Sequence, residues 1–142
     1  MKVNWSRVIG GGLLAGLVGN LLQIAYGLVM RGQMEAAMKA AHREFVPTPT
    51  VIVSHFLWTF VIGIAAIWLY AAIRPRYGPG PRTAVRAGLA VWIFAHATFA
   101  IAAVTLGFFP AQLMAIEAAW GLVERLVSTL AGAAVYREQP AA

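Results

Sequence analysis

The sequence contains no cysteine and few charged residues. Charged side chains make up 11% of the 142 residues, whereas soluble globular domains average about 25%. Without cysteine the chain cannot form a disulfide, a thiolate metal site, an iron–sulfur cluster or a cysteine nucleophile. The scarcity of charge excludes an ordinary soluble domain.

Apolar residues dominate what is present. Hydrophobic residues make up 61% of the chain and the mean hydropathy is +0.74, which is typical of an integral membrane protein. A chain of 142 residues fits one domain. We therefore predict a single transmembrane domain over residues 1–142.

Four apolar runs are long enough to cross a bilayer, since about 20 helical residues span the hydrocarbon core. Prolines, glycines and charged residues separate the runs. The predicted fold is an all-α, up-down-up-down four-helix membrane bundle, with a short interfacial helix over residues 34–43 after the first span. The expected spans cover residues 8–30, 51–73, 83–107 and 110–136.

Basic residues are distributed unevenly between the two ends of this bundle. The positive-inside rule places the more basic end in the cytoplasm, so both termini are predicted to be cytoplasmic. Because these residues flank apolar runs and form no continuous basic face, they predict lipid head groups as partners and no nucleic acid. Seven lie at one end, Lys2, Arg7, Arg74, Arg76, Arg82, Arg86 and Arg137, against Arg31, Lys39 and Arg43 at the other.

Several polar side chains interrupt the apolar runs at membrane depth. An ionised group there costs roughly 2.5–3.5 kcal/mol on insertion scales unless a partner compensates it. At about 1.5 Å of rise per residue, four of them fall in one central layer, namely Asn20, His96, Glu117 and Glu124. Gln23 and His55 are expected nearer the outer mouth of the bundle.

The two glutamates lie seven residues apart on one face of the last span, which must point into the bundle or an oligomer interface. The simplest partner for either is His96 on the adjacent span, with Asn20 as a second partner. Two interpretations remain open. The layer is either a satisfied polar clamp that fixes helix register, or a protonatable relay or ligand site.

Arg125 has no evident partner in the sequence. It directly follows Glu124, and neighbouring side chains on a helix do not face each other. The alternatives are Ser128 and Thr129, bound water, lipid phosphate reached by snorkelling, or an acid of a second copy. Arg125 is therefore expected to contact lipid or to join copies of the chain in a homo-oligomer.

The sequence predicts no metal site and no cofactor. It contains neither an H-x-x-x-H pattern nor an E-x-x-H pair of the di-iron type. A haem held by two histidines needs both imidazoles at one level, whereas His55 and His96 differ in expected depth by about 10 Å.

Three short stretches carry a resemblance. Residues 5–8 read WSRV, residues 11–18 read GGLLAGLV and residues 35–38 read EAAM. They resemble parts of a group of small, uncharacterised bacterial four-span membrane proteins, in which a short Trp- or Met-rich helix often follows the first span. The resemblance implies a multi-pass protein of the bacterial inner membrane, and it carries over no activity and no catalytic residue.

The function that the sequence favours is that of a small, non-enzymatic membrane protein with a structural or accessory role. The alternative is a small proton-coupled transporter or carrier that uses the intramembrane Glu and His residues. A membrane redox or lipid-modifying enzyme is disfavoured because no ligand set is evident.

Overall fold

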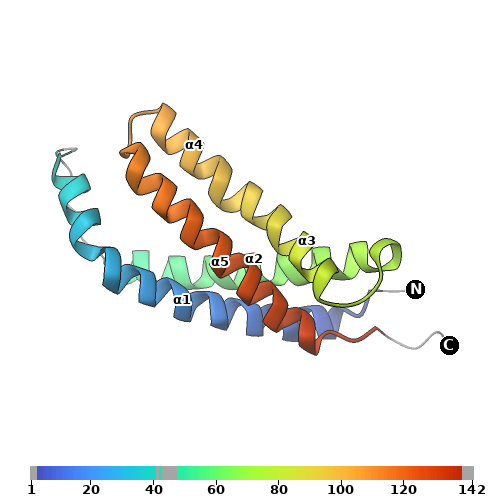
Figure 1. Ribbon diagram of the computed structural model, residues 1–142. Helices are drawn as coiled ribbons and strands as arrows, with labels where there is room; N and C mark the ends of the chain where they lie inside the picture. The colour runs from blue at the N-terminus through green and yellow to red at the C-terminus, as the bar shows by residue number, and fades with distance from the viewer. Residues whose placement is uncertain (1–2, 41, 43–47, 139–142) are drawn as a thin grey trace.

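The described part of the chain is entirely helical. The computed structural model describes residues 3–40, 42 and 48–138, which contain helices and no strands. Four helical segments are long and apolar enough to cross a membrane, which confirms the predicted all-α chain with four apolar helices. These segments are α1 (Trp5–Ala40), α2 (Pro49–Tyr77), the stretch Pro81–Thr105, and α5 (Ala111–Val135) (Figure 1).

Helix α1 is longer than the predicted first span. Its 36 residues correspond to about 54 Å, whereas the hydrocarbon core is about 30 Å thick. The helix continues to Ala40, so no break separates it from the expected short helix, of which residues 41 and 43 lie outside the described residues. No proline interrupts this stretch, and Arg31 Nε donates to Glu35 Oε1 at 2.8 Å across one turn.

The third apolar segment contains a change of helix type. It consists of α3 (Pro81–Trp92), the π-helical turn η1 (Ile93–Ala97) and α4 (Thr98–Thr105), which follow without a break. π-Helical turns are rare and occur frequently at functional sites. The turn after this segment contains Gly107, whose φ of 70° suits a residue without a side chain.

Helix α5 contacts all the other helical elements of the described chain. Helix α1 packs against α2 and α5, while α3 packs against α5 and α2. The start of α1 lies beside the end of α5, where Asn4 N donates to Tyr136 Oη at 3.4 Å. The end of α2 joins the same end of the bundle, because Arg74 forms an ion pair with Glu138 at 3.4 Å.

Glycines bring α1 into backbone contact with both neighbours. A Cβ atom built on Gly63 of α2 would lie 2.5 Å from Gly12 O and 2.6 Å from Gly16 N. On the other side of α1, a Cβ atom on Gly11 would lie 2.7 Å from Gly132 O of α5. Small residues permit such close approach, on which helix association in lipid depends. We call Gly11, Gly12, Gly16, Gly63 and Gly132 the glycine contact.

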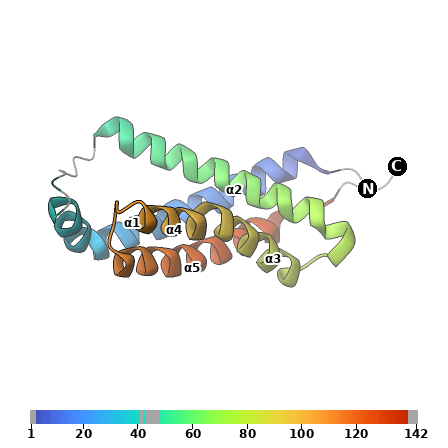
Figure 2. The same ribbon diagram turned by 90° about the horizontal axis from the view of Figure 1, so that it is seen from above.

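The bundle is open at the other end. Within the described residues the backbone of α2 lies close to that of α3 but not to that of α4, and Figure 2 shows the start of α2 well separated from α4. Large side chains fill much of the space between α1, α4 and α5 here, including Tyr26, Met30, Leu113 and Met114. The helices are therefore tightly joined near the chain ends and spread apart at the opposite end.

Replacing Gly63 with alanine should destabilise the fold. The new methyl group would meet the α1 backbone, which cannot rotate away, and overpacking of this kind costs about 1–3 kcal/mol. Unfolding in mixed micelles with increasing dodecyl sulfate measures the effect. Gly10→Ala is the matched control, because nothing lies within 4 Å of its Cβ position. Equal stability of the two variants would contradict the close α1–α2 approach.

Candidate functional site

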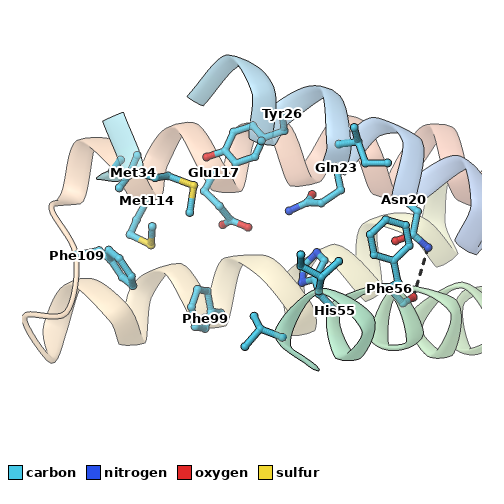
Figure 3. Close-up of a pocket in the computed structure, with 15 residues that line it drawn as sticks. Asn20, Gln23, Tyr26, Met34, His55, Phe56, Phe99, Phe109, Met114 and Glu117 are labelled. Carbon is cyan, nitrogen blue, oxygen red and sulfur yellow. Dashed lines mark hydrogen bonds between the residues drawn. The ribbon is translucent and has the colours of Figure 1, made fainter. Parts of the chain in front are cut away.

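A cavity lies at the open end of the bundle. It encloses about 420 Å³ between α1, α2, α4 and α5, within the range of about 300–1,000 Å³ common for small-molecule sites. Its wall is mostly apolar, as such sites usually are. The aromatic and sulfur-containing side chains of this wall are Tyr26, Met34, Phe56, Phe99, Phe109 and Met114 (Figure 3).

Four polar side chains share this cavity. Asn20 and Gln23 come from α1, His55 from α2 and Glu117 from α5. All four were identified from the sequence as residues of the central layer or its outer mouth. The fold brings them together because α2 and α5 both pack against α1. Glu117 is the one carboxylate among the lining residues, and no lysine or arginine lines the cavity.

Glu117 is joined to the third apolar segment through His96. His96 Nδ1 and Glu117 Oε1 form a hydrogen bond of 3.0 Å. The imidazole belongs to η1 and lies so close to α5 that a Cβ atom on Gly121 would collide with the ring. Trp92, the last residue of α3, also joins this segment to α5, because its Nε1 donates to Ala118 O at 2.8 Å. Of the two glutamates considered as partners of His96, the structure therefore pairs it with Glu117.

Two acceptor atoms of the cavity residues have no hydrogen-bond partner within the described part of the chain. They are Asn20 Oδ1 and Glu117 Oε2, and both atoms are buried. The Asn20 amide is oriented by its nitrogen, which donates to Phe56 O at 3.4 Å. A buried polar atom without a partner costs about 1–3 kcal/mol. A bound molecule with donor groups would remove this cost.

Glu124 and Arg125 form a separate polar group, two helical turns along α5 from Glu117. Their side chains make an ion pair, and each residue is only 2% exposed. The pair packs against α1, because a Cβ atom on Gly19 would lie 3.2 Å from Arg125 Nη2 and 3.4 Å from Glu124 Oε1. Neither residue lines the cavity.

The position of Arg125 differs from the sequence-based expectation of a contact with lipid or a second copy. Adjacent side chains leave a helix about 100° apart, so their Cβ atoms do not face each other. Both side chains are long, however, and the groove beside Gly19 lets them bend until their ends meet. Burial in this groove encloses Arg125 within the bundle.

The predicted central layer is thus divided in two. Asn20, Gln23, His55 and Glu117 surround the cavity, with His96 behind Glu117, while Glu124 pairs with Arg125 beyond it. Ser128 and Thr129, considered as partners for Arg125, are buried. Ser128 Oγ donates to the backbone oxygen of Arg125 at 3.3 Å, so its hydrogen bond goes to the backbone of Arg125 and not to the guanidinium group.

Sequence reasoning missed the apolar wall of the cavity. Phe56, Phe99 and Phe109 line it, and the ring of Tyr26 stacks on Trp120 with centroids 5.8 Å apart. Aromatic residues in an apolar span are equally compatible with lipid contact or core packing. No local signal separates these from a cavity wall, because the cavity depends on how far α2 and α4 diverge.

No three His, Cys, Asp or Glu residues of the described ranges lie close enough together to hold a metal ion. Comparison of the chain with protein-family models, curated proteins and solved structures finds no match. What the site can bind therefore follows from the chemistry of its own residues.

The buried ion pair predicts a non-additive response to mutation. Glu124→Gln leaves the Arg125 charge unpaired, and Arg125→Met leaves that of Glu124, so each should destabilise the protein by about 3–5 kcal/mol. The double variant contains neither charge and should fall within about 1 kcal/mol of the wild type. Dodecyl sulfate unfolding of the four proteins measures the cycle. Losses that simply add in the double variant would show that the pair is not formed.

Proposed function

We propose that the chain is a multi-pass protein of a bacterial inner membrane that binds a small, largely apolar molecule inside its helical bundle. The observation that carries this proposal is the cavity of about 420 Å³ with Glu117 in its wall. In this proposal the four apolar helices cross the membrane in up-down-up-down order. Both termini are cytoplasmic.

The distribution of basic residues supports this orientation. Arg74 reaches Glu138 just after α5, so the arginines at the end of α2 share one end of the bundle with the basic residues near both termini. The positive-inside rule places this end in the cytoplasm. The last turns of α1, beyond Met30, then extend past the hydrocarbon core on the opposite side, where an interfacial position suits them.

The cavity favours ligand binding over a purely structural or accessory role. A structural role would account for the glycine contact and for the Glu124–Arg125 pair. It gives no reason for a cavity of this size with unpaired acceptors in its wall, since protein interiors are normally close-packed. Transport of the bound molecule is the second function that the site supports, because the His96–Glu117 pair is protonatable and adjoins the cavity.

The route into the cavity is lateral in this proposal. Val51, Ile52 and Phe99 line it and are 53%, 46% and 53% exposed. They belong to α2 and α4, which do not contact each other. Apolar side chains around an opening between two membrane helices face lipid, so the ligand would enter from the bilayer.

The orientation can be tested with single cysteines, because the chain contains no native cysteine. Gly32→Cys lies on the last turns of α1, and Arg82→Cys lies at the start of α3; both positions are exposed. A membrane-impermeant maleimide should label Gly32→Cys in intact bacterial spheroplasts and Arg82→Cys only after permeabilisation. The reverse pattern would place the termini outside.

Filling the cavity should abolish ligand binding without unfolding the protein. Gly27 lines the cavity, and nothing lies within 4 Å of its Cβ position, so the ring of Gly27→Phe can occupy the space. We expect saturable binding of 4-phenylbutanol to the wild type in phosphatidylcholine nanodiscs. The variant should bind at least about tenfold more weakly, a difference of about 1.4 kcal/mol.

Gly10→Phe is the matched control for this experiment. Nothing lies within 4 Å of its Cβ position either, and Gly10 is not part of the cavity wall. Its affinity for 4-phenylbutanol should equal that of the wild type. Equal affinities in all three proteins would mean that the probe does not use this cavity.

A further inference from the structure

We infer that the cavity binds an amphiphilic organic cation, with its charged, hydrogen-bond-donating head group on Glu117 and its apolar body against the aromatic wall. This inference depends on the proposed function, since it names the class of ligand for the same cavity. Three features of the site carry it: the charge of the wall, the type of its unpaired atoms, and the position of its opening.

The charge of the wall selects a cation. Glu117 is the one acid among the lining residues, and no lysine or arginine accompanies it. The nearby positive charge of Arg125 is matched by Glu124. His96 contacts Oε1 of Glu117 and leaves Oε2 without a partner in the described structure. Hydrogen bonds from a cation to a carboxylate are stronger than neutral ones, and more so in a medium of low dielectric constant.

The two unpaired atoms of the cavity wall favour a ligand head group that donates hydrogen bonds. Asn20 Oδ1 and Glu117 Oε2 are both acceptors. An ammonium group offers three donors and no acceptor, so it can satisfy such atoms. A carboxylate or phosphate head group would add further acceptors and leave these two unpaired. The amide of Gln23 and the neutral imidazole of His55 can each present an acceptor to the ligand, so in these forms neither opposes the cation.

The apolar part of the cavity selects an amphiphile. Figure 3 shows Met34, Phe109 and Met114 at the end of the cavity remote from Asn20, with Glu117 between them. A ligand with its head group at Glu117 would therefore extend its apolar body along this end. The opening between α2 and α4 is lined by exposed apolar residues, which suits a molecule already dissolved in the bilayer.

A matched set of three probes tests the inference. At pH 7, 4-phenylbutylamine is a cation, 4-phenylbutanol is neutral and 4-phenylbutanoate is an anion, while their apolar bodies are the same. Equilibrium binding to the full chain in phosphatidylcholine nanodiscs is measured, with empty nanodiscs subtracted. The amine should bind about 10- to 100-fold more tightly than the alcohol, and the carboxylate should bind most weakly.

Glu117→Gln separates charge from shape. The amide keeps the size of the side chain, so the variant should bind the alcohol as the wild type does and lose the preference for the amine. Glu35→Gln is the control, because Glu35 is an exposed acid that pairs with Arg31 away from the cavity. It should retain the full preference. If Glu117→Gln does not fold, the ratio of amine affinity to alcohol affinity in the wild type still tests whether the cavity prefers a cation.

The outcomes distinguish this inference from the proposed function. Alcohol or carboxylate binding as tight as amine binding, and lost in Gly27→Phe, would overturn the cation and leave the ligand site standing. An amine preference that survives Glu117→Gln would likewise overturn the assigned counter-ion. Absence of saturable binding by all three probes would overturn both.

Discussion

The backbone contact of α1 with α2 and α5 determines the shape of the bundle. Helices in lipid gain little from the hydrophobic effect when they associate, so close packing has to hold them together. Gly12 and Gly16 provide it against Gly63, and Gly11 provides it against Gly132. These residues lie near one end of the bundle. At the other end α2 diverges from α4, and the cavity lies between these two helices, α1 and α5.

The two intramembrane glutamates of α5 have different surroundings because one lies towards the tight end of the bundle and the other at the open end. Glu124 lies towards the tight end, outside the cavity wall, where it is buried and paired with Arg125. Glu117 lies at the open end, where it lines the cavity and is bonded to His96 through one of its oxygens. Uncompensated charge is costly in a membrane. Glu124 is therefore enclosed by the bundle, whereas Glu117 can meet a molecule in the cavity.

Much of the fold could be predicted from the sequence, because length, hydropathy and proline positions depend on local properties. The four apolar helices are of this kind. The continuous α1 and the π-helical turn at His96 could not be predicted, since neither has a distinct local pattern. The ion pair of Glu124 with Arg125 depends on the groove beside Gly19. The cavity depends on the divergence of α2 from α4, which is a property of the assembled bundle.

The asymmetry of the bundle also explains how a stable scaffold and the proposed ligand site could coexist in so small a protein. At the closed end Arg74 lies over the ring of Tyr136 at 5.5 Å and forms an ion pair with Glu138, while Tyr70 Oη accepts a hydrogen bond from Gly80 N. These contacts hold the end of α2, and the glycine contact holds its middle. The start of α2, with Val51 and His55, lacks contact with α4. A molecule bound between these helices would supply the missing contacts, and the closed end would not have to rearrange to admit it.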